Sequence, residues 1–120
     1  MDNQIWLRGR LRSDPVEMDG TGLVVAAFVL ENEQKAQGKR GRPKSEIVPW
    51  CDVVCEGELA SNVLSSVIEG DYVLVRGELR VHRLHPVDDA RDSVMMSVRA
   101  ESIGLDLHTG VTKPLHMHRN

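Results

Sequence analysis

Alternation of apolar and polar side chains with a period of two is the feature that most constrains the fold of this 120-residue chain. In residues 5–12, Ile5 and Leu7 fall on one face of an extended backbone, whereas three arginines fall on the other. Such a pattern is typical of a β-strand with one buried side. Four further stretches have the length and composition of strands, at residues 23–30, 47–55, 71–81 and 94–107.

One stretch has a helical period instead. Leu59, Val63 and Val67 recur every four residues, and Gly57 and Gly70 bound the stretch. This spacing predicts a helix of about three turns between the third and fourth strands.

A helix in that place among five strands is the layout of the OB-fold, a small and partly open Greek-key barrel that binds oligonucleotides and oligosaccharides. A chain of this length suits one domain. We therefore expect an all-β fold with one short helix: a five-stranded OB-fold barrel over residues 1–107, followed by a flexible C-terminal tail over residues 108–120.

Positive charge is concentrated in one segment. The chain has 15 Lys and Arg residues against 18 Asp and Glu residues, which excludes a uniformly basic nucleic-acid coat and leaves only a local patch for a polyanion. Residues 35–44 contain no acidic residue and are interrupted by glycine and proline, which predicts a long basic loop or a protruding hairpin. The cations of this segment are Lys35, Lys39, Arg40, Arg42 and Lys44.

The residues favour neither catalysis nor metal binding. Cys51 and Cys55 stand about 13 Å apart on an extended strand, which is too far for a disulfide, and we expect reduced thiols in the core. The chain lacks a nucleophile elbow, a phosphate loop and calcium-loop spacing. We therefore expect no enzyme activity, no metal, no cofactor and no small-molecule substrate.

The N-terminal residues lack the basic-then-apolar pattern of a signal peptide, and no apolar run has the length of about 18 residues that a membrane helix needs. These observations predict a cytoplasmic protein without a membrane partner.

Five segments occur in an order that points to one known family. The most specific is residues 69–80, which read Glu-Gly-Asp-Tyr-Val-Leu-Val-Arg-Gly-Glu-Leu-Arg. The others are residues 5–11 followed by Asp14-Pro15, residues 22–30, Pro49-Trp50 with Val53-Val54, and residues 57–63. In these segments the chain resembles the bacterial single-stranded DNA-binding protein family over roughly its first 107 residues.

The resemblance implies a homo-oligomer, either a homodimer or a homotetramer, whose first strand pairs with its twin across a dimer. It also implies that single-stranded DNA is held by base stacking and by contacts to the charged backbone. The first-strand residues at this interface are Ile5, Trp6, Leu7 and Arg8.

The chain departs from the family at its stacking positions. Family members typically stack bases on four aromatic residues, and among the matching positions only Trp50 is aromatic. The other three positions are occupied by Ala36, Glu56 and Leu84. Because each stacked base contributes about 1–3 kcal/mol, we expect weaker binding with a larger electrostatic share.

The charged positions depart from the family as well. Basic positions of the family correspond to Arg80, His82 and Arg83, which we expect to contact the nucleic acid. Other positions that are usually basic are occupied by Asp52, Glu58 and Glu69. The acidic-apolar tip with which the family recruits partner proteins has no counterpart in this sequence.

The leading hypothesis is a sequence-tolerant, nucleoid-associated protein that binds single-stranded DNA in replication, recombination or repair, using the basic segment and Trp50. A second hypothesis is a divergent paralogue that acts as an oligomeric protein-interaction module, similar to a primosomal accessory protein, with weak or no DNA binding. RNA binding stays open as a third, because nothing in the sequence distinguishes deoxyribose from ribose.

Overall fold

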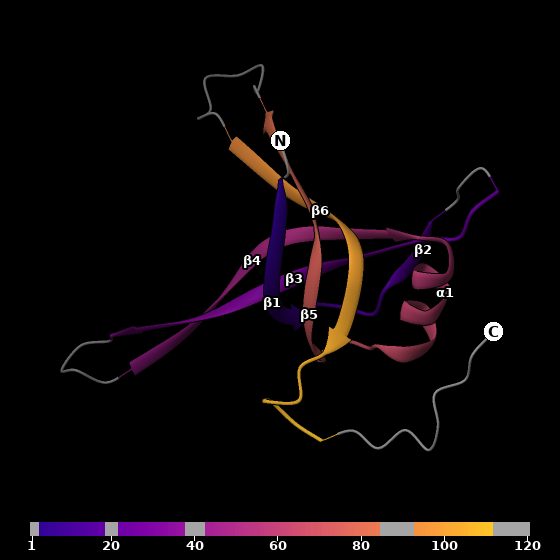
Figure 1. The fold of residues 1–120 in the computed structure, drawn as a ribbon. Coiled ribbons are helices and arrows are strands. Elements are labelled where there is room, and N and C mark those ends of the chain that lie inside the picture. The colour runs from indigo at the N-terminus through magenta and orange to yellow at the C-terminus, as the bar shows by residue number, and fades with distance from the viewer. Residues whose placement is uncertain (1–2, 19–21, 38–42, 85–92, 112–120) are drawn as a thin grey trace.

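A computed structural model shows six strands and one helix (Figure 1). In chain order they are β1 (Gln4–Leu11), β2 (Val16–Met18), β3 (Val25–Gln37), β4 (Pro43–Glu56), α1 (Gly57–Ser66), β5 (Tyr72–Leu84) and β6 (Ser93–Leu105). The structure describes residues 3–18, 22–37, 43–84 and 93–111, and it describes side chains for residues 3–18, 22–32, 50–82 and 95–111.

The strands form one sheet that closes on itself. Their order is β1-β5-β6-β4-β3-β2, and an additional pairing of β1 with β3 completes the ring. The described pairings are antiparallel except for that of β4 with β6, which is parallel. The expected OB-fold barrel, with its helix between the third and fourth long strands, is confirmed.

The short strand β2 was not expected from the sequence. It adds to the edge of β3 through three residue pairs, and all three of its side chains are exposed. Three exposed residues are too few to produce a recognisable period, which is why the alternation does not reveal this strand.

The inward-facing residues of the strands form the core, which small and β-branched side chains dominate. The helix α1 closes one end of it with Ala60 and Val63. Cys51 and Cys55 are buried and free, as expected. Burial, and secondarily the charge of Asp52, raises the pKa of the Cys51 thiol to about 11, so this thiol stays protonated at neutral pH.

Close backbone contact explains one glycine in the barrel wall. The pairing of β5 with β6 shifts register between Arg76 and Gly77, which leaves Glu101 as the extra residue of a β-bulge. At this point the two backbones approach so closely that a Cβ on Gly77 would lie 2.2 Å from the Arg99 carbonyl oxygen. Only glycine fits this position without displacing the backbone of β6.

The seam between β1 and β3 depends on a buried carboxylate. The strands pair there over two residues, and one of these pairs joins Arg10 to Glu31. Glu31 is 8% exposed, and its carboxylate lies 3.0 Å from Arg10 Nη2 and 3.5 Å from Arg12 Nε. Two guanidinium groups therefore compensate the buried negative charge where the ring closes.

Replacing Gly77 with alanine should lower the free energy of unfolding by about 2 kcal/mol or more, because the new methyl group overlaps the backbone of β6. Gly104→Ala is the matched control, since a Cβ at Gly104 meets no atom within 4 Å. Urea unfolding of both variants measures the difference. Equal stability of the two variants would contradict the close approach.

Glu31→Gln should lower the free energy of unfolding by about 1–2 kcal/mol at neutral pH, because it removes the buried charge that Arg10 and Arg12 share. Glu78→Gln serves as the control, since its ion pair with Arg80 is exposed and should contribute less than about 0.5 kcal/mol. Denaturant unfolding measures both, and similar losses in the two variants would argue against a special role for the seam.

Candidate nucleic-acid interface

Strands β3 and β4 extend beyond the barrel as a long hairpin (Figure 1). Their antiparallel pairing continues to Gln37 and Pro43. Of the two forms expected for residues 35–44, the hairpin is therefore the one observed. Lys35 and Lys44 lie in its two strands. Three other cations of the segment lie outside the described residues: Lys39, Arg40 and Arg42.

Trp50 lies where this hairpin joins the barrel. Leu30 pairs with Cys51, and Glu31 pairs with Pro49, so Trp50 is the extra residue of a β-bulge. Its side chain is half-buried and packs against the edge of the core. Trp50 is therefore neither sealed inside the barrel nor fully exposed, and part of its surface is accessible to a ligand.

A shallow groove lies on the outer surface of β4, β6 and β5. The strand register places Asp52, Ser97 and Arg80 in one row across this surface. Val54, Arg99 and Glu78 form the next row. The groove has a volume of about 350 Å³, and its lining includes Arg80, His82, Ser97 and Arg99.

The groove brings together two of the three residues that the family resemblance assigned to this region. Arg80 and His82 both line it from β5. Arg83 follows in the same strand, and its backbone pairs with Val94. The sequence reasoning did not include Arg99, although strand alternation could have placed it on the outer face of β6. Sequence reasoning could not supply the register of β6 against β4, which places Arg99 opposite Val54.

The described arginines form ion pairs with carboxylates. Every arginine whose side chain the structure describes forms an ion pair with an aspartate or a glutamate. On the groove, Arg99 Nη2 lies 3.1 Å from Glu56 Oε1. Outside the described side chains, the sequence still contains the acid-free segment 35–44. This hairpin segment is therefore where the sequence concentrates positive charge.

The expected interface residues of β1 point in different directions. Trp6 is 71% exposed, Leu7 is buried in the core, and Ile5 is half-buried against it. The Arg76 guanidinium lies over the Trp6 ring, 5.9 Å from its centroid. Strand β1 pairs with β5 over residues 4–10 but with β3 only at residues 10 and 11, so most of its other backbone edge has no strand partner in the described chain.

Arg8 of β1 pairs with Asp106, just beyond β6. Partial burial raises the pKa of Asp106, but hydrogen bonds from the His108 backbone N–H and from Arg8 outweigh that effect and leave the pKa below its usual value. The carboxylate is therefore ionised at neutral pH and compensates the charge of Arg8.

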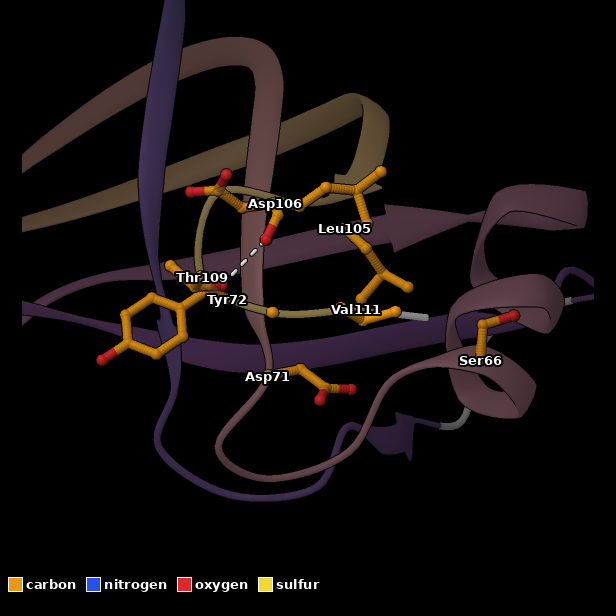
Figure 2. Close-up of a pocket in the computed structure, with 9 residues that line it drawn as sticks. Ser66, Asp71, Tyr72, Leu105, Asp106, Thr109 and Val111 are labelled. Carbon is orange, nitrogen blue, oxygen red and sulfur yellow. Dashed lines mark hydrogen bonds between the residues drawn. The ribbon is translucent and has the colours of Figure 1, made fainter. Parts of the chain in front are cut away.

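Figure 2 shows a smaller pocket, of about 200 Å³, beside this carboxylate at the end of β6. The Thr109 hydroxyl donates a hydrogen bond of 2.8 Å to the Asp106 carbonyl oxygen at its wall. Among the described residues, its lining contains the carboxylates of Asp71 and Asp106 and no Lys or Arg, which does not suit a phosphate.

Two other kinds of site are absent from the described part of the chain. There, His, Cys, Asp and Glu side chains nowhere gather in a group of three that could hold a metal ion. Over the same residues, no helix is long and apolar enough to span a membrane.

Comparison with known proteins adds independent information. The fold is similar to the crystal structure of the small single-stranded DNA-binding protein from Streptomyces coelicolor, with a TM-score of 0.73 and 24% sequence identity over 92% of this chain and 99% of that chain. No curated protein matches the sequence. The family model for the Single-strand binding protein family matches residues 2–106, which is most of the chain. This protein therefore belongs to the single-strand binding protein family.

Proposed function

We propose that this protein binds single-stranded DNA with little sequence preference, through the basic hairpin of β3 and β4 and through Trp50 at its base. The observation that carries the proposal is the distribution of charge. The described arginines are paired with carboxylates, whereas residues 35–44 contain five cations and no acid. A polyanion is attracted most to the segment in which cations are concentrated.

The hairpin and the indole supply complementary contacts. Lysine and arginine side chains along the hairpin neutralise phosphates and release counterions, which makes the affinity strongly dependent on salt. The exposed part of Trp50 gives one base a surface on which to stack. On β5, Arg80 and His82 line the groove, and Arg83 follows in the same strand, so we expect this part of β5 to contact the nucleic acid as well.

The same arrangement limits affinity. Asp52 lies two residues from Trp50 on the same strand, and Glu56 lies at the end of that strand. Both carboxylates repel phosphate, and both stand where the family usually has a basic or aromatic residue. We therefore expect binding that is weaker than is usual in the family and that depends mainly on the hairpin.

We further propose that the protein is a homodimer or homotetramer that contributes to replication, recombination or repair in the cytoplasm, associated with the nucleoid. The part of the β1 edge that has no strand partner among the described residues and the exposed Trp6 support assembly, because both offer contacts to a second copy. Light scattering of the purified protein gives the number of subunits.

Reversing three hairpin charges, with Lys39→Glu, Arg40→Glu and Arg42→Glu, should weaken binding to oligo-dT by about 100-fold or more at low salt, because several phosphate contacts become repulsive. Fluorescence anisotropy of a labelled oligonucleotide measures the affinity. Lys113→Glu with Arg119→Glu, near the end of the chain, is the charge control and should change affinity far less. Unchanged affinity in the triple variant would exclude the hairpin as the site.

Binding of oligo-dT should quench the fluorescence of Trp50. The other tryptophan, Trp6, is on β1, so a Trp6→Phe variant isolates the signal of Trp50. We expect saturable quenching in Trp6→Phe and little quenching in the matched variant Trp50→Phe. Trp50→Ala should bind with about 5- to 100-fold lower affinity, because one stacked base is lost. Quenching confined to Trp50→Phe would place the bases on Trp6 instead.

A second candidate function is an oligomeric protein-interaction module with weak or no DNA binding. The pairing of the described arginines with carboxylates favours it, because these cations are already compensated. A stable oligomer that fails to bind an oligo-dT of about 35 nucleotides at low salt would support this candidate over the first. Competition between matched DNA and RNA strands distinguishes an RNA-binding role.

A further inference from the structure

The groove across β4, β6 and β5 contains a cation that sequence reasoning did not assign to any role. Arg99 projects from the outer face of β6 and is 56% exposed at its side chain. Arg80, His82 and the polar Ser97 lie in the same groove. Glu56 lines the groove as well. The two guanidinium groups and the Ser97 hydroxyl are donors that suit a phosphate group.

Arg99 forms an ion pair with Glu56. The Glu56 carboxylate oxygen lies 3.1 Å from Arg99 Nη2, and the Glu56 side chain is 39% exposed. Glu78 lies directly across the strand pair from Arg99, but its carboxylate is 3.7 Å from Arg80 Nε. Exposed ion pairs of this kind contribute only about 0–1 kcal/mol each, so a phosphate can compete for either guanidinium.

The fold does not require the Glu56 side chain at this position. Glu56 is the residue that precedes α1, yet its side chain makes no capping hydrogen bond to the helix. The strand end is instead held by its backbone neighbour, since the Gly57 N–H donates to the Val24 carbonyl oxygen at 2.8 Å. A substitution of Glu56 therefore leaves the supports of the helix intact.

The groove lies on the strand that carries Trp50. Val54 is four residues from Trp50 on β4 and is part of the groove lining. Along an extended strand, Val54 is about 13 Å from Trp50. A DNA strand that contacts the exposed part of the indole can therefore extend along β4 to Arg99.

We propose that the groove is a further phosphate-contact site for single-stranded DNA, and that Glu56 limits its affinity by competing with the phosphate for Arg99. This inference rests on the proposed DNA-binding function. It identifies Glu56 and Arg99 as a pair of residues that together set how tightly this protein holds a single strand.

A double-mutant cycle tests the pair with the full-length protein. Glu56→Gln should bind labelled oligo-dT about 3- to 10-fold more tightly than the wild type at about 50 mM salt, because Arg99 becomes available to phosphate. The dependence of log affinity on log salt should become steeper by about 0.7, the value for one added phosphate contact on a single strand. Arg99→Gln should weaken binding, and the double variant should match Arg99→Gln.

Glu17→Gln is the matched control, because it changes the net charge equally on the exposed strand β2. A gain in Glu56→Gln that equals the gain in Glu17→Gln, or that persists in the double variant, would overturn the role of Arg99 and leave the proposed function standing. If the wild type binds and Glu56→Gln binds no more tightly, the inference falls and the proposed function stands. If neither protein binds, both proposals fall.

Discussion

Closure of the sheet between β1 and β3 is the constraint on which the rest of the structure depends. The two strands pair over two residues only, and the buried Glu31 meets Arg10 and Arg12 at that seam. A carboxylate that is removed from water is stable only when opposite charge and hydrogen bonds compensate it. The observed register supplies this compensation by pairing Arg10 with Glu31, and β3 continues from the seam into the hairpin.

The candidate interface is built from the same strands as the core. Strand β4 contributes Val53 and Cys55 to the interior and continues outward into the hairpin. The bulge at Trp50 separates the barrel part of β4 from its hairpin part. The extra residue interrupts the regular alternation of side chains between the two faces of the strand. Residues that contact a ligand are thus carried by elements that the core already positions.

The sequence predicted the parts of the fold that depend on periodicity. Alternation in residues 5–12 and 71–81 and the four-residue spacing of Leu59, Val63 and Val67 correspond to β1, β5 and α1. The lengths of β3 and β4 were underestimated, because residues 31–37 and 43–46 are mostly polar in sequence and therefore show no apolar period.

The candidate site was predictable only in part, for a related reason. The family resemblance identified Arg80 and His82, and the structure brings both to one groove. The pairing of Arg99 with Glu56 depends on the parallel register of β4 and β6, between residues more than 40 positions apart, and no local pattern encodes that register. The close approach at Gly77 is likewise visible only once β5 and β6 are paired.

The strand order has a consequence for how this chain is made. Strand β6 is the last to leave the ribosome, yet it lies between β5 and β4 in the finished ring. Until it emerges, β4 and β5 each present an open hydrogen-bonding edge, and the apolar interior cannot be enclosed. Synthesis must therefore pass Leu105 before the barrel can close, so the strands that are made earlier stay in an open sheet until β6 is available.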